Sequence, residues 1–187
     1  MPRLLMATAL VAGMTAWVAG DKDHVRNDIL KLAETIARGD RAAADQQAAE
    51  IAKKSQLENV MDLLKLRVKQ GLGVGSQPGS IRPDGIEAQI INLSKKAMRP
   101  NDLEARAKDL AQAARITAAI ALVAQRSCPV AKKEGDKDPK QWDQWSHDMY
   151  EEAIRLAAAA EAHNPKDVKA VSSKLDSSCN ACHAVFK

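Results

Sequence analysis

The stretch "IRLAAAAEAHNPKDVKAVSSKLD", residues 154–176, predicts two helices joined by a tight turn. Apolar residues recur at spacings of three and four on both sides of Asn164-Pro165, which is the period of an amphipathic helix. Asparagine is a favoured N-cap residue, and proline is tolerated at the first helical position. The pattern therefore predicts a helical hairpin, with one helix ending near Ala162 and the next beginning at Asn164-Pro165.

The same period extends over most of the chain, and no stretch alternates β-branched with polar residues, so the sequence predicts an all-α fold. Asn101 and Glu104 form a candidate capping box for a long helix, and Asp138-Pro139 is a good start for another. The solvated run 132–139 and the glycine-rich run "GLGVGSQPGSIRPDG" interrupt the pattern as linkers. The helices expected before the last one cover about 23–38, 41–68, 86–98, 101–126 and 139–162.

The first 20 residues have the layout of a secretory signal peptide. One positive charge, Arg3, precedes an apolar run from Leu4 to Ala19, and small residues stand at Val18-Ala19-Gly20. This run is shorter than the ~20 residues that usually span a bilayer, although an uncleaved anchor remains an alternative. We therefore expect cleavage near Gly20, export to the periplasm, and a single soluble domain over residues 21–187 without a stable membrane span.

Composition limits the function further. The formal net charge is +4, and its signs alternate without a dense basic face interleaved with aromatic residues, which argues against nucleic-acid binding. Beyond the predicted signal peptide, the aromatic residues are Trp142, Trp145, Tyr150 and Phe186. A core of Ala, Leu, Ile and Val with so few rings leaves room for a large flat apolar group.

The run "CNACH", residues 179–183, contains the residues best suited to bind a cofactor. At 100° per residue Cys179 and Cys182 share the apolar face of the last helix, and His183 lies beside that face. C-x-x-C-H is the pattern of c-type haem attachment, in which the thiols bind the two vinyl groups and the imidazole binds iron. The three cysteines of the chain, with Cys128 as the third, cannot form a closed disulfide framework.

Two other interpretations of the motif fit less well. A structural zinc site needs four ligands, but the four residues after the motif contain neither cysteine nor histidine. A thioredoxin-like disulfide begins a helix after a strand, whereas this motif closes a helix in an all-α chain. We therefore expect one covalent haem c, with a metal site or a disulfide as the alternatives.

Residues 138–187 resemble the class II c-type cytochromes, a family that includes cytochrome c′. The resemblance rests on Trp142, Trp145, the run Ala157–Ala160, the Asn164-Pro165 turn, and the ending "CNACHAVFK". It implies an antiparallel four-helix bundle with one haem, and it makes a homodimer plausible. It also implies that Cys179 and Cys182 are the thioether sites and that His183 is the proximal iron ligand.

The N-terminal two-thirds of the chain match that family poorly. The chain is longer than the family's usual form, and it inserts the 71–85 loop. We therefore expect the bundle to carry an extra N-terminal or inserted helical segment and a glycine-rich loop, and the resemblance leaves the other face of the haem undecided.

The sixth iron ligand is open in this family, because cytochrome c′ leaves the position empty and its low-spin relatives fill it with a methionine. Met61 is the candidate here, within an apolar stripe that includes Leu64 and Val68, although core packing is the commoner role for such a residue. The run 30–52 resembles 154–176, which would bring Met61 close to His183 if the similarity is structural rather than a shared alanine-rich composition.

Other polar residues receive lesser roles. His147 projects away from the apolar face of its helix and is expected at the surface. Lys65, Arg67 or Lys69 would lie near the haem propionates, unless they belong to a solvated helix end followed by a loose loop, which the composition favours. Cys128 is expected to be a buried small residue, with an intermolecular disulfide as the alternative.

The sequence therefore predicts one-electron transfer to and from redox partner proteins. No paired acid and base or activated nucleophile stands out, so we do not expect an enzyme. Binding of a diatomic gas, nitric oxide or carbon monoxide, at an open distal haem face is the main alternative. A haem-free helical protein that binds a metal or serves as a scaffold is a third.

Overall fold

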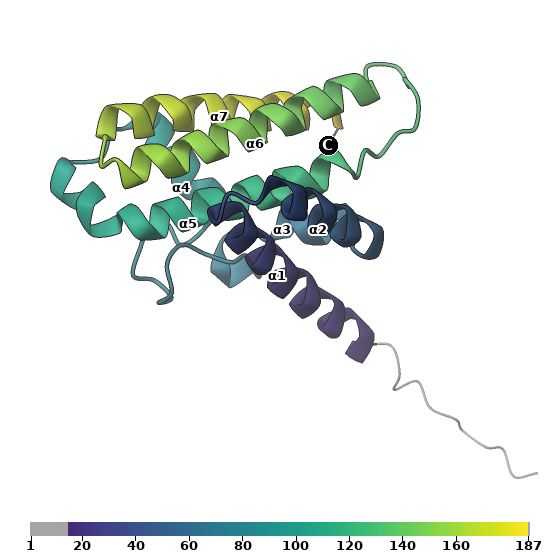
Figure 1. Ribbon diagram of the computed structural model, residues 1–187, viewed down its shortest axis with the longest axis horizontal. Coiled ribbons are helices and arrows are strands. Elements are labelled where there is room, and N and C mark those ends of the chain that lie inside the picture. Colours follow the sequence, from purple (N-terminus) through teal and green to yellow (C-terminus); the bar gives the residue numbers. More distant parts are fainter. Residues whose placement is uncertain (1–14, 187) are drawn as a thin grey trace, which may run out of the picture.

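The computed structural model describes the backbone of residues 15–186 and the side chains of residues 22–186 (Figure 1). This part of the chain is all-helical, which confirms the predicted fold class. The predicted signal peptide, residues 1–20, lies mostly outside it, so cleavage stays a prediction. No helix of the described part is long and apolar enough to cross a membrane. The elements are α1 (Thr15–Ala37), α2 (Arg41–Lys54), α3 (Leu57–Asp62), the 3-10 helix η1 (Arg67–Lys69), α4 (Ile86–Lys95), α5 (Pro100–Gln125), α6 (Pro139–Glu161) and α7 (Pro165–Phe186).

The long helices α5, α6 and α7 pack side by side in chain order (Figure 1). The turn from α6 to α7 is tight, with His163 in the left-handed region at φ 53°. Asn164 caps α7, since its Oδ1 accepts hydrogen bonds from the backbone N–H groups of Lys166 and Asp167 at 3.2 and 3.3 Å. Asp138 caps α6 in the same way, through Lys140 N at 2.9 Å. Both predicted helix starts are confirmed.

Helix α5 forms the centre of the molecule. Residues 116–124 are buried on every side, because α1, α2 and α3 cover one side of α5 and α6 covers another. A helix that is apolar all round is expected to be buried in this way. Its start differs from the prediction: Arg99 occupies the N-cap and Pro100 the first position, so Asn101 lies inside the helix and forms no capping box.

The region between α1 and α4 departs most from the sequence expectation. Instead of one helix over 41–68, α2 ends at Lys54, and Ser55 and Gln56 adopt extended backbone before α3. The break redirects the chain so that Val60 is fully buried as α3 packs against α1 and α5. Val68 is 90% exposed and does not belong to an apolar stripe. Packing against α1 and α5 has overridden the helical period of the sequence.

The glycine-rich loop, 71–85, is held together by one carboxylate, so the expected loose loop is wrong. Asp84 accepts hydrogen bonds from Arg67 Nε at 2.9 Å and from the backbone N–H groups of Val74 and Gly79 at 3.0 and 2.9 Å. Gly73 has φ 73°, and a Cβ there would lie 2.4 Å from the guanidinium of Arg67. The left-handed backbone at this position favours glycine, and a side chain there would also have to displace the guanidinium.

Candidate functional site

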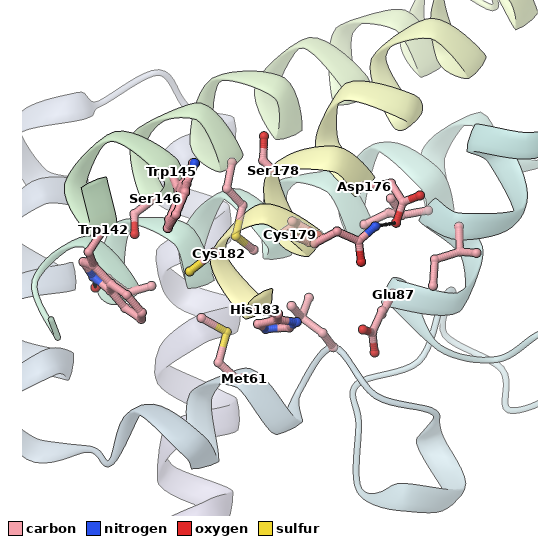
Figure 2. A pocket seen from close by; sticks show the side chains of 17 residues that line it. Met61, Glu87, Trp142, Trp145, Ser146, Asp176, Ser178, Cys179, Cys182 and His183 are labelled. Atoms are coloured by element: carbon pink, nitrogen blue, oxygen red, sulfur yellow. Dashed lines mark hydrogen bonds between the residues drawn. The ribbon is translucent and has the colours of Figure 1, made fainter. Parts of the chain in front are cut away.

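A pocket opens where α5 and α7 end and α6 begins, and α3 and α4 close its opposite side (Figure 2). Its empty space, counted together with the open mouth, is about 730 Å³. Most of its lining is apolar. These side chains include Met61, Leu64, Ile90, Ile91, Trp142 and Met149.

One wall of the pocket is the last part of α7. Cys179, Cys182 and His183 all line it, and Figure 2 shows them on the pocket side of the helix. Val168 and Leu175 on the same face are fully buried at 1% and 0% exposure, which fixes the rotation of α7. The expectation that both sulfurs and the imidazole share one side of the helix is confirmed, and His183 lies at the more exposed end of the wall.

Aromatic contacts attach the end of α7 to its neighbours. Trp142 Nε1 donates a hydrogen bond to the carbonyl oxygen of Ala124 at 2.7 Å, which links α6 to α5. The ring of Phe186 packs edge-on against Trp142 and Trp145, with ring centroids 4.9 and 6.1 Å apart. Each such pair contributes about 0.5–1.5 kcal/mol beyond burial. These contacts hold the cysteine motif against the pocket.

The two thiols of the motif stay protonated at neutral pH. Burial raises the pKa of Cys179 to about 12, and the charges of Glu87 and Asp176 add to the increase. Burial also raises the pKa of Cys182 to about 11, with a contribution from nearby Cys128. Because the thiolate is the form that attacks disulfides and binds zinc, these thiols are poorly suited to rapid disulfide exchange.

All three cysteines are free in the structure. Cys128 is half-buried rather than buried, and its thiol donates a hydrogen bond to the carbonyl oxygen of Val130 at 3.2 Å.

Among the residues whose side chains are described, no group of three or more His, Cys, Asp or Glu side chains is arranged to hold a metal ion.

Met61 lines the pocket from the wall opposite α7 (Figure 2). Its side chain is half-buried and packs against the core. The predicted proximity of Met61 and His183 is therefore confirmed, although the long helix that was expected to carry Met61 is interrupted before it. Iron binding by Met61 stays a prediction. His147 is exposed, as expected.

The sequence analysis missed the two carboxylates at the pocket, Glu87 and Asp176. Asp176 stands three residues before Cys179, and helical spacing would have placed it beside the motif. Glu87 gave no such signal, because it reaches the pocket only through the packing of α4 against α7. Lys65, Arg67 and Lys69, which the sequence offered only as the less favoured candidates for contact with the propionates, do not line the pocket. Arg67 instead bonds Asp84.

Known proteins give no further indication of the function. A comparison of the chain with models of known protein families, with curated proteins and with solved structures found no match.

Proposed function

We propose that this chain is an exported c-type cytochrome that transfers one electron through a single covalently bound haem. The observation that supports this most is the meeting of Cys179, Cys182 and His183 on one apolar pocket. The two thiols and the imidazole are the groups that c-type haem attachment requires. The residues present therefore fit the group that their spacing implies.

Each motif residue has a distinct task in this proposal. Cys179 and Cys182 would hold the haem through thioether bonds, each S–H adding across one vinyl group. His183 would hold the iron through its imidazole. The bound haem supplies one-electron chemistry, and the apolar lining formed by Ile90, Trp142 and other side chains excludes water from it.

The helices around the site support a finer fold assignment. We propose that α5, α6, α7 and the shorter α4, which packs mainly against α7, form an antiparallel four-helix bundle in which facing helices enclose the cofactor. The α1–α3 region is then the additional segment. Electron transfer also requires redox partner proteins that donate and accept the electron. We further propose that the protein forms a homodimer.

The second candidate function is binding of a diatomic gas. The wall opposite His183 contains Leu64, Ile90 and Ile91 beside Met61. If Met61 only packs, that wall offers an apolar face at which nitric oxide or carbon monoxide reaches the iron.

The deciding experiment is the optical spectrum of the protein purified from a host that attaches c-type haem, oxidised, reduced, and reduced with carbon monoxide. The denatured mass is measured alongside. We expect a mass one haem above the polypeptide and sharp low-spin bands. High-spin bands that carbon monoxide shifts would favour gas binding. The mass of the bare polypeptide without haem bands would reject both functions and favour the haem-free metal-binding or scaffold protein.

A further inference from the structure

The mostly apolar pocket carries two carboxylates close to the cysteine motif. Glu87 stands in the first turn of α4, and Asp176 lies one turn before Cys179 on α7. Figure 2 shows the Glu87 carboxylate on the side of the pocket where His183 also lies. These two side chains give this end of the pocket negative charge.

Glu87 is held in place by its backbone rather than by its side chain. Its N–H donates a hydrogen bond to the carbonyl oxygen of Leu64 at 3.0 Å, which joins the start of α4 to the chain just after α3. Ile86 and Ile90 on either side are 1% and 6% exposed and anchor this turn in the core. The backbone of Glu87 is therefore anchored at the edge of the pocket, and its side chain is exposed there.

Neighbouring positive charge cancels this carboxylate only in part, because the Lys65 ammonium, whose pKa Asp62 and Glu87 both raise, is shared with Asp62. Lys65 is the nearby cation, and its Nζ forms an ion pair with Asp62 Oδ1 at 2.5 Å. The second pocket carboxylate, Asp176, accepts a hydrogen bond from the neutral amide of Asn180 at 3.2 Å. The negative charges of Glu87 and Asp176 also contribute to the raised pKa of the Cys179 thiol, so their field reaches the attachment sulfur.

We propose that the negative charge of Glu87 favours the oxidised state of the haem iron and so lowers its reduction potential, an inference that rests on the proposed function. Reduction transfers one electron from a one-electron donor protein to the iron. The donor is oxidised, the iron is reduced, and no bond forms or breaks. A negative charge at the edge of the pocket opposes the arrival of that electron. Solvent screens the exposed side of the carboxylate, whereas the apolar pocket lining screens its field less than water does.

The test is a redox titration of the haem-loaded Glu87→Gln variant, which removes the charge and keeps the shape of the side chain. The matched control is Glu104→Gln on α5, a likewise exposed carboxylate that lies 13 residues, or about 20 Å, along the helix from Thr117, the nearest α5 residue of the pocket. We expect a more positive midpoint potential for Glu87→Gln and no change for Glu104→Gln. Equal midpoints for Glu87→Gln and the unmodified protein, or equal shifts in both variants, would overturn the inference.

A second readout needs no haem. In the folded protein prepared without haem, iodoacetamide should alkylate Cys179 faster in Glu87→Gln than in the unmodified chain, because the thiolate is less opposed by neighbouring charge. Peptide mass mapping identifies the labelled cysteine, and an unchanged rate would contradict the placement of Glu87. A chain that never acquires haem rejects the proposed function itself. A haem-loaded chain without a midpoint shift rejects only the role of Glu87.

Discussion

The two walls of the pocket differ in how far apart their residues lie in the sequence. On α7, the wall-forming Cys179, Cys182 and His183 come from five consecutive positions. The opposite wall combines Met61 with Ile90, which the ordered loop 71–85 separates. A single helix thus presents everything that covalent attachment needs, whereas the groups that face the other side of a bound haem depend on how separate segments fold together.

The largest expected effect is the loss of haem when the cysteines of the α7 wall are replaced. Replacing Cys179 and Cys182 together, Cys179→Ser and Cys182→Ser, removes both proposed thioether sites, and we expect complete loss of covalently bound haem in the denatured mass. Cys128→Ser is the control, because Cys128 does not line the pocket, and it should retain the haem. Haem that stays covalently bound in the double variant would contradict the assignment of the attachment sites.

The same wall should protect its thiols in the protein prepared without haem. At pH 8, unfolding in urea lowers the pKa of Cys179 from about 12 to about 8.5, so its thiolate fraction and alkylation rate should rise roughly a thousandfold. Cys182, with a pKa of about 11, should show a smaller rise. The sign for stability follows: above about pH 8.5 the unfolded chain releases protons that the folded chain retains, so the folded form loses stability. Equal alkylation rates in the two states would show that the thiols are not buried.

A substitution of Met61 tests whether the opposite wall supplies a ligand to the iron. If its thioether binds the iron, Met61→Ala should abolish the sulfur-to-iron absorption near the red edge of the oxidised spectrum and leave the covalent haem in place. Met98→Ala is the matched control, since Met98 is half-buried against the core but does not line the pocket. An unchanged spectrum in Met61→Ala would assign this residue to packing and favour the gas-binding alternative.

The loop that joins the two parts of the opposite wall should give the smallest effect. Partial burial acts to raise the pKa of Asp84, but hydrogen bonds from Arg67, Gly79 and Val74 hold it below its ordinary value. The stabilisation is therefore present at neutral pH and is lost as the pH falls below about 3.9. Asp84→Asn should cost about 1–3 kcal/mol at pH 7 in urea unfolding.

Two further observations check the role of Asp84. The cost of Asp84→Asn should shrink in acid, where the carboxylate of the unmodified protein is protonated. Asp136→Asn, in the exposed linker before α6, should change the free energy of unfolding little. An equal cost at both pH values would show that Asp84 does not stabilise the loop through its charge.

Predictions of helix starts from short local signals succeeded at two positions and failed at a third, the capping box expected at Asn101. Asp138 and Asn164 cap their helices as expected, because the hydrogen bonds they accept come from residues two or three positions away. The helix expected over 41–68 failed, because its break at Ser55 and Gln56 follows from packing against α1 and α5. Nothing in the helical period of that segment records those partners.

By itself the sequence determined an all-helical chain and a motif whose two sulfurs and imidazole share one helix face, because both follow from backbone periodicity over a few turns. Only the tertiary structure decided that Met61 and Glu87 line the pocket opposite that face, and that burial raises the pKa of Cys179 to about 12. Proximity and desolvation arise when α3 and α4 pack against the rest of the molecule. No local spacing of residues can specify them.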